Sequence, residues 1–439
     1  APIQRRLDDL AADIETQQEL GERALEAIEV APDVLGEDDE RVYFVMFTTP
    51  AEARGQGGFM GNYAEITIAD GLIELTTLGR HSELSRGGER PRHLEDAPED
   101  WLARYGQFGF QMGPDGDVGS VPWSNITMSP HFPSTAQVVA ELYPQSGGRP
   151  IDGVFSIDVF VMEDLVGLVG PVQLETGRRL TGRNTADYLL VDQYLETGGR
   201  VRRDQLELVA EEVIAGLLGG RAPGIVELGR ALAPRVDERR LLAWFADDEE
   251  QQLVEHVGLE GALPAPSDRS IAFAVTNASG NKIDSVLDTE ADVRADGTTT
   301  TFTLEVTNNA PDEGFPRYVI GNLVGRPRGT NLSYVTVFST GELVGAELDG
   351  RPVDVTSEAE EGLHAYSLFV EVASGASATL ALELAEPSDA TLREPSVLSP
   401  PLARAPRWDA VFATADGPEA VCGQFSGLVA PGAATTCRG

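Results

Sequence analysis

The spacing of apolar residues changes twice along the chain. Leu7, Leu10 and Ile14 belong to a set with helical spacing over residues 2–30, which predicts an amphipathic helix in an N-terminal segment, 1–40. That helix either docks on the following domain or ends a membrane-proximal stalk. From 41 to 262, apolar runs typical of buried strands alternate with helical patterns. This alternation predicts an α/β domain with a mixed sheet flanked by helices.

Two stretches of this α/β region carry more specific signals. Tyr63–Ile68 and Leu72–Thr77 are strand-like runs on either side of Asp70 and Gly71, a pair typical of a tight hairpin turn. Residues 82–122 are rich in glycine, proline and charge, and we expect a long surface loop there. Loops of that length inside a domain are usually functional or mobile.

The apolar period switches to two in the second half of the chain. Alternating runs such as Thr301–Thr307 and Ala378–Leu384 are separated by short polar turns. Several short strands at this spacing predict an immunoglobulin-like β-sandwich over 267–388. Residues 389–439 are rich in proline and alanine and are expected to form an extended tail with a terminal disulfide.

Composition narrows the classes of function. The chain has 439 residues and a formal net charge of −38, which argues against nucleic acid as a partner because nucleic-acid binding needs a basic face. So much acid is most simply a means of solubility. Lys282 is the only lysine, and the preference for arginine, alanine and glycine suggests a GC-rich, actinobacterial source.

The two cysteines indicate the compartment. Cys422 and Cys437 lie close together near the C-terminus, and a disulfide between them would imply an oxidising environment. No run of about 18 apolar residues is present to span a membrane. The chain begins at Ala1 without a signal sequence, so we expect an extracytoplasmic protein, at the cell surface or secreted, whose only membrane anchor was a removed N-terminal segment.

Four arginines are the main candidates for chemistry. Arg54, Arg80, Arg200 and Arg203 occur in two local clusters, and arginine suits phosphate because its planar fork offers several donors and keeps its charge. Gln205 is a candidate for orienting the same ligand. Ordinary salt bridges to the many carboxylates are the alternative role for these arginines.

Common catalytic motifs are missing from the sequence. It contains no Walker sequence, no GxSxG elbow and no HExxH pair, and its five histidines are scattered. We therefore predict no zinc site. Paired carboxylates for glycoside hydrolysis stay open, because the sequence gives no separations between the 71 acidic residues.

Several segments resemble the LytR-CpsA-Psr family. Leu180–Leu189 and Gly199–Gln205 resemble its signature "L-x-G-x-x-A-L-x-Y…G-R-I-x-R-Q-Q", and Ile151–Asp158 resembles its "ID-x-x-V-x-V-D". Arg54 and Arg80 fall in the order of that family's two N-terminal arginines. The resemblance implies an α/β domain that handles a polyprenyl-pyrophosphate-linked glycan, with arginines on the pyrophosphate, an Asp-bound magnesium and an apolar tunnel for the lipid.

A closer resemblance is to an uncharacterised extracytoplasmic actinobacterial family. It rests on Ala51–Tyr63, Phe132–Ala136, Asp237–Trp244 and Asn277–Lys282 and covers most of residues 1–385. This second family implies no particular activity.

The chain departs from the LytR-CpsA-Psr pattern where metal would bind. Gln56 and His81 stand where those enzymes have aspartates, so Mg²⁺ is possible but its carboxylates are replaced. Three hypotheses follow: a glycopolymer phosphotransferase or related hydrolase, a domain that binds a lipid-linked or wall glycan without chemistry, and a non-catalytic structural or assembly component that contacts other envelope proteins. We favour the LytR-CpsA-Psr-like role on a glycan or lipid carrier.

Overall fold

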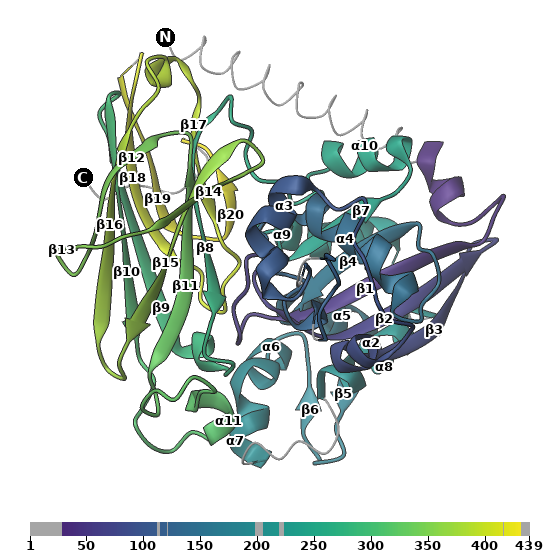
Figure 1. The fold of residues 1–439 in the computed structure, drawn as a ribbon. Coiled ribbons are helices and arrows are strands. Elements are labelled where there is room, and N and C mark those ends of the chain that lie inside the picture. The colour runs from purple at the N-terminus through teal and green to yellow at the C-terminus, as the bar shows by residue number, and fades with distance from the viewer. Residues whose placement is uncertain are drawn as a thin grey trace, which may run out of the picture.

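The computed structural model describes residues 29–111, 115–120, 122–197, 205–218, 224–415 and 417–431. The helix predicted over 2–30 lies almost wholly outside the described residues. Figure 1 shows two bodies side by side, a helix-covered sheet formed by the first half of the chain and a β-sandwich formed by the second. The predicted fold class, α/β followed by a β-sandwich, is confirmed.

A five-stranded sheet forms the centre of the first body, in the order β3-β2-β1-β4-β7. Only β1 and β4 run parallel, and the other neighbours are antiparallel, so the sheet is mixed. Its strands are β1 (Arg41–Thr49), β2 (Phe59–Ala69), β3 (Leu72–Arg80), β4 (Gly153–Asp158) and β7 (Leu241–Phe245).

Both faces of this sheet are buried, which explains why β1 reads as a continuous apolar run. Successive side chains on a strand point to opposite faces. Phe44 and Met46 pack with the core beneath α4 (Phe132–Gln145). Val45 and Phe47 pack with the core beneath α5 (Val159–Val169) and α8 (Gln205–Leu218).

Shorter elements complete this body. They are α2 (His81–Arg86), α3 (Glu99–Tyr105), η1 (Gly106–Phe108), η2 (Pro122–Ser124), β5 (Val172–Gln173), β6 (Arg179–Leu180), α6 (Thr185–Asp187), η3 (Tyr188–Asp192), α7 (Gln193–Thr197), α9 (Ile225–Asp237) and α10 (Asp248–His256).

The β2–β3 hairpin forms as expected, with positive φ at both Asp70 and Gly71. The stretch 82–122 differs from the expected surface loop because it contains helices α2 and α3 and the turns η1 and η2. Trp101, Phe110 and Trp123 are fully buried against the α4 side of the sheet. Burial of three large aromatic side chains ties the segment to the core.

The second body consists of two packed sheets. One has seven strands in the order β13-β12-β16-β10-β9-β18-β19, and the other has six in the order β14-β15-β11-β8-β17-β20. The strands are β8 (Arg269–Asn277), β9 (Leu287–Ala295), β10 (Thr299–Asn308), β11 (Asn331–Ser339), β12 (Glu342–Leu348), β13 (Arg351–Pro352), β14 (Thr356–Glu360), β15 (Leu363–Val372), β16 (Ser377–Ala385), β17 (Pro395–Ser399), β18 (Arg407–Thr414), β19 (Gly417–Gln424) and β20 (Gly427–Val429).

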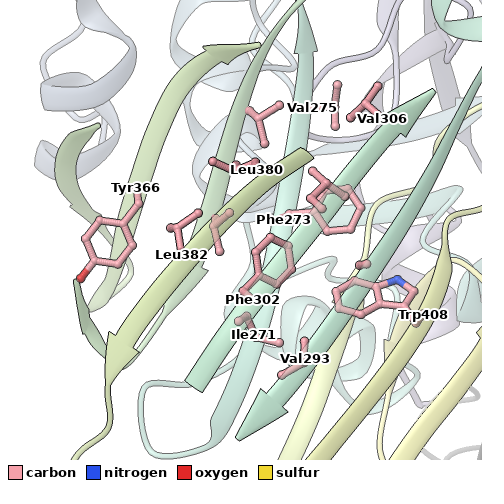
Figure 2. Packing of buried hydrophobic residues seen from close by; sticks show 14 of the residues in the cluster. Ile271, Phe273, Val275, Val293, Phe302, Val306, Tyr366, Leu380, Leu382 and Trp408 are labelled. Carbon is pink, nitrogen blue, oxygen red and sulfur yellow. The ribbon is translucent and has the colours of Figure 1, made fainter. Parts of the chain in front are cut away.

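Alternation along these strands places one face inward and the other toward water. In β10, Phe302 and Leu304 point into the core, whereas Thr301 and Glu305 are exposed. Figure 2 shows Phe273, Phe302 and Trp408 meeting between the sheets. Three short helical turns lie outside the strands: η4 (Ile283–Val286), α11 (Arg317–Ile320) and η5 (Ala390–Leu392).

The C-terminal stretch differs from the extended tail expected over 389–439. β17 pairs in parallel with β8, and β18 pairs in parallel with β9, so the stretch adds strands to both sheets. Trp408 explains this difference because its ring is buried in the sandwich core. Cys437 lies outside the described residues, so its disulfide with Cys422 stays a prediction.

Buried polar contacts join the two bodies. The Ala53 backbone N–H donates to Oδ2 of Asp284 at 3.0 Å. On the α3 side, Arg104 Nε lies 3.0 Å from a carboxylate oxygen of Glu360. Buried ion pairs need good geometry to offset the cost of desolvation, so these contacts fix one relative orientation of the two bodies.

Candidate functional site

A polar cavity of about 210 Å³ opens at the edge of the five-stranded sheet. Thr49 lies at the end of β1, and Val159 follows the end of β4. Because β1 and β4 are parallel, their carboxyl ends meet at one edge, where ligands commonly bind in open α/β sheets. The start of β2, the β3–α2 junction and α8 supply further walls, and Lys282 and Tyr318 reach in from the sandwich.

Two polar side chains at this cavity are buried without partners. Asn62 is 0% exposed, and neither its amide nitrogen nor its amide oxygen has a hydrogen-bond partner. The Thr49 hydroxyl is also without a partner. Native structures leave few buried polar groups unpaired, because each costs about 1–3 kcal/mol. Both residues line the cavity, so a bound polar ligand would offset this cost.

Lys282 supplies a buried positive charge to the cavity wall. Only 4% of the residue is exposed, and its Nζ donates to Oε2 of Glu52 at 2.7 Å. Nζ also lies 4.9 Å from the ring centroid of Phe59, within the range of a cation–π contact. Burial alone lowers the pKa of Lys282, but attraction to Glu52 outweighs it, so the net pKa is raised and the ammonium stays charged.

Arg80 and His81 add to the basic character of the cavity. Arg80 Nε lies 3.6 Å from a carboxylate oxygen of Glu207, a half-exposed contact that contributes little energy. The Nδ1 of His81 lies 3.2 Å from the Gly61 carbonyl oxygen, and the His81 ring meets the edge of Phe59. No carboxylate lines this cavity among the described residues. In a chain with a net charge of −38, this is a local basic site.

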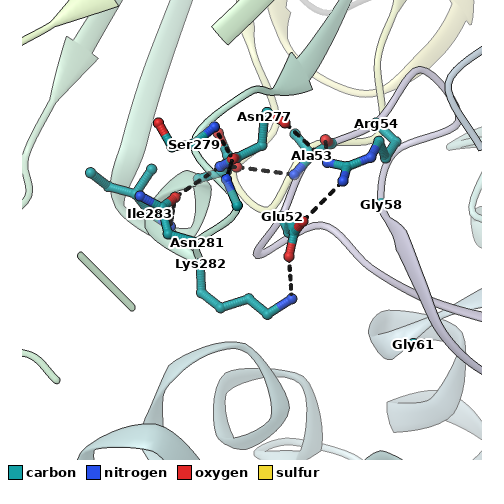
Figure 3. A network of polar contacts seen from close by, with 12 residues as sticks. Glu52, Ala53, Arg54, Gly58, Gly61, Asn277, Ser279, Asn281, Lys282 and Ile283 are labelled. Atoms are coloured by element: carbon teal, nitrogen blue, oxygen red, sulfur yellow. Dashed lines mark hydrogen bonds and ion pairs between the residues drawn. The ribbon is translucent and has the colours of Figure 1, made fainter. Parts of the chain in front are cut away.

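The structure separates Arg54 from Arg80. Arg54 is 5% exposed, and its Nη2 donates to Oε1 of Glu52 at 2.9 Å (Figure 3). Its Nη1 donates to the backbone carbonyls of Ala53 and Asn277. Arg54 therefore lines a different space, a groove between the two bodies, while Arg80 lines the polar cavity.

The remaining candidates for phosphate binding are Gln205, Arg200 and Arg203. Gln205 begins α8, and its neighbour Leu206 lines the polar cavity. Arg200 and Arg203 lie outside the described residues. Phosphate binding by these four arginines and Gln205 therefore stays a prediction.

A magnesium site does not fit the described side chains. Gln56 is buried away from the polar cavity, beside Arg239 and Pro401 in a hollow of about 10 Å³. His81 does line the cavity. Within the described ranges, no group of three or more His, Cys, Asp or Glu side chains is placed to hold a metal.

The cavity residues that were not among the sequence candidates include Lys282, Asn62 and Thr49. The status of Lys282 as the only lysine was a usable signal, because one lysine kept among many arginines marks a position where a compact ammonium is preferred. Asn62 and Thr49 gave no signal, since a strand asparagine or threonine is common and its missing partner appears only in three dimensions.

One family model of unknown function matches part of the chain. Residues 38–194 match the family model described as "Protein of unknown function (DUF4012)". No curated protein matches the chain. Of the helices that the structure describes, none combines the length and apolar character needed to cross a bilayer.

The solved structures that are similar over about half of the chain include three described below. The Lin1025 protein of Listeria innocua has 14% identity over 51% of this chain and 81% of its own, with a TM-score of 0.22. The Bacillus subtilis protein yvhJ, described as a transcriptional regulator, has 12% identity over 50% and 76%, with a TM-score of 0.18. Bacillus subtilis TagV has 12% identity over 50% and 80%, with a TM-score of 0.22.

Over residues 38–194 the chain is thus similar to a family of unknown function. TM-scores of this size carry no argument about substrate or chemistry. The functional conclusion accordingly depends on the residues of the polar cavity itself.

Proposed function

We propose that this chain is an extracytoplasmic cell-envelope protein whose α/β domain binds the phosphate group of a polyprenyl-phosphate-linked or cell-wall glycan in the polar cavity. The observation that carries the proposal is the unpaired amide of Asn62 in a wall that contains Lys282 and Arg80. An anion suits this wall, because it can accept from the amide nitrogen while the two cations balance its charge.

Glu52 holds the buried cation of the cavity wall in position. Glu52 is shared between Lys282 and Arg54, so one carboxylate faces two cations. The pKa of Glu52 is lowered, because attraction to Lys282 and Arg54 outweighs the opposing effect of its burial. Glu52 therefore stays ionised and holds the ammonium of Lys282 in place beside the cavity.

Binding without transfer is the form of the proposal that this wall supports. Transfer from a pyrophosphate needs a means to neutralise developing charge and a base for the attacking hydroxyl. The described wall offers no carboxylate for either task. The sequence resemblance of Leu180–Leu189 to the LytR-CpsA-Psr signature therefore supports the class of ligand in this proposal, and we do not extend it to the transfer reaction.

Isothermal titration calorimetry with farnesyl pyrophosphate tests this proposal, with inorganic pyrophosphate and farnesol as separate probes. Arg80→Gln keeps a polar side chain that can donate hydrogen bonds but removes the charge. Arg86→Gln is the matched control, because Arg86 is exposed at the end of α2 and does not line the cavity.

We expect saturable binding of both pyrophosphates, weakened about tenfold by Arg80→Gln and unchanged by Arg86→Gln. Absence of binding to the wild-type protein would overturn the proposal and favour the structural or assembly role. Release of inorganic phosphate or pyrophosphate from farnesyl pyrophosphate would show turnover and contradict the binding-only form.

A further inference from the structure

A second space, here called the junction groove, lies between the α/β domain and the sandwich. Its volume is about 480 Å³, within the usual range for small-molecule sites. Phe108 lines it from η1, Tyr334 from β11 and Phe369 from β15, while Leu323 lies in the loop after α11. The junction groove shares no lining residue with the polar cavity among the described residues.

The wall of the junction groove is apolar and exposed to water. Leu323 is 86% exposed, Phe369 55% and Val324 42%. The rings of Phe108 and Tyr334 are 6.2 Å apart and those of Tyr334 and Phe369 4.9 Å apart, so an aromatic row crosses from one body to the other. A contiguous exposed apolar surface of this kind often marks a binding site.

One cation lies at this otherwise apolar wall. Arg54 is only 5% exposed. Its two terminal nitrogens donate hydrogen bonds, whereas its Nε has no hydrogen-bond partner. Figure 3 shows Arg54 and Lys282 on opposite sides of Glu52. Glu52 pairs with both cations, and the buried carboxylate of Asp284 also interacts electrostatically with Arg54, so what Arg54 offers to a ligand is its unpartnered Nε–H. No carboxylate lines the junction groove within the described ranges.

We propose that the junction groove binds a long-chain carboxylate, with its alkyl chain along Tyr334, Phe369 and Leu323 and its head group toward Arg54. Apolar contact with the aromatic row supplies most of the affinity, because burial of alkyl surface is favourable in proportion to its area. The unpartnered Nε–H of Arg54 can donate to the head group, and a charge-assisted hydrogen bond to a carboxylate is stronger than one to a neutral hydroxyl. This site is separate from the polar cavity and does not depend on the function proposed for it.

Calorimetric titration of the whole chain with dodecanoate tests the site, with dodecanol as the uncharged probe. Leu323→Asp places a like charge and a shorter side chain at the mouth of the groove. Because Leu323 is 86% exposed, the substitution should leave the fold intact. Leu392→Asp is the matched control, since Leu392 is 76% exposed on η5 and does not line the groove.

We expect one dodecanoate per chain, binding at least about tenfold weaker in Leu323→Asp and equally well in Leu392→Asp. Dodecanol should bind at least about fivefold more weakly than dodecanoate. Equal affinity for the two probes, no saturable binding, or an equal loss in both variants would overturn the proposal. A dimer in native mass spectrometry that Leu323→Asp abolishes, without dodecanoate binding, would assign the groove to a second copy instead.

Two further measurements separate this site from the polar cavity. Arg80→Gln should retain dodecanoate binding, and Leu323→Asp should retain pyrophosphate binding. Loss of dodecanoate binding in Arg80→Gln would place the ligand in the polar cavity and refute the second site.

Discussion

Asp284 carries a pH dependence of stability that can be worked out from its surroundings. Oδ2 of Asp284 accepts from the Asn277 side chain at 2.6 Å and from the Ala53 backbone at 3.0 Å, whereas Oδ1 has no partner. Burial raises the pKa of Asp284 from 3.8 to about 6, against the lowering effect of these hydrogen bonds. The residue lies at the contact between the two bodies.

The sign follows from proton binding in the two states. The pKa of Asp284 is higher in the folded state than in the unfolded state. At pH values between these two pKa values, the folded state therefore binds more protons than the unfolded state. The contribution of Asp284 to stability is fully present below about pH 4 and is lost as the pH rises through about 6. A shift of about two pKa units changes the free energy of unfolding by about 3 kcal/mol over the whole pH range. About half of this change occurs between about pH 5 and pH 8.

Asp284→Asn should remove this dependence, because asparagine cannot ionise and its carbonyl oxygen can still accept both hydrogen bonds. The free energy of unfolding of the variant, relative to that of the wild type, should increase by about 1.5 kcal/mol between about pH 5 and pH 8. This increase does not depend on the difference between the two proteins at pH 5. Urea unfolding followed by tryptophan fluorescence measures this, since Trp101, Trp123 and Trp408 are buried.

Asp296→Asn is a control of opposite sign. Asp296 is exposed, and hydrogen bonds from the backbone of Thr298 and Thr299 lower its pKa. Its contribution to stability is present above its ordinary pKa and is lost as the pH falls. A difference between wild type and Asp284→Asn that does not change with pH, or that shrinks as the pH rises, would refute the assignment of Asp284.

Two further predictions concern buried charge. Lys282→Met leaves Glu52 with one partner instead of two and should lower the free energy of unfolding, measured by urea unfolding, by about 3–5 kcal/mol. Adding Glu52→Gln to this variant should recover part of that loss. Equal losses in the single and the double variant would contradict the pairing of Lys282 with Glu52. Burial and nearby Arg239 lower the pKa of His131 to about 4, so its contribution to stability is present above about pH 6.5 and lost as the pH falls. Between about pH 7 and pH 5, His131→Asn should lose about 2 kcal/mol less of its free energy of unfolding than the wild type does. The same pH profile in both proteins would exclude a buried neutral His131.

Much of the fold could be predicted from apolar spacing alone. The β2–β3 hairpin and the alternating strands of the sandwich are local patterns, and a local pattern suffices when each strand has one buried face. The stretch 82–122 and the C-terminal stretch were harder. Their place in the fold depends on where Trp123 and Trp408 find a core, and that core is built by residues far away in sequence.

The candidate site could be predicted only in part. Arg80 and His81 reach the polar cavity because the β3–α2 junction ends beside β2, which a hairpin prediction implies. Arg54 is held elsewhere by Glu52, and nothing in the sequence shows which of many carboxylates an arginine will meet. Lys282 comes from the second body, so its place in the cavity depends on how the two bodies pack.

Asn62 tests the central claim most directly, because it separates binding from stability. Asn62→Leu removes an unpaired buried amide and keeps a side chain of similar size, so the free energy of unfolding should stay the same or rise by about 1 kcal/mol. Titration of this variant with inorganic pyrophosphate is the decisive measurement. Our account predicts a stable protein that has lost at least about tenfold in affinity. A stable Asn62→Leu protein that binds pyrophosphate as the wild type does would contradict the account.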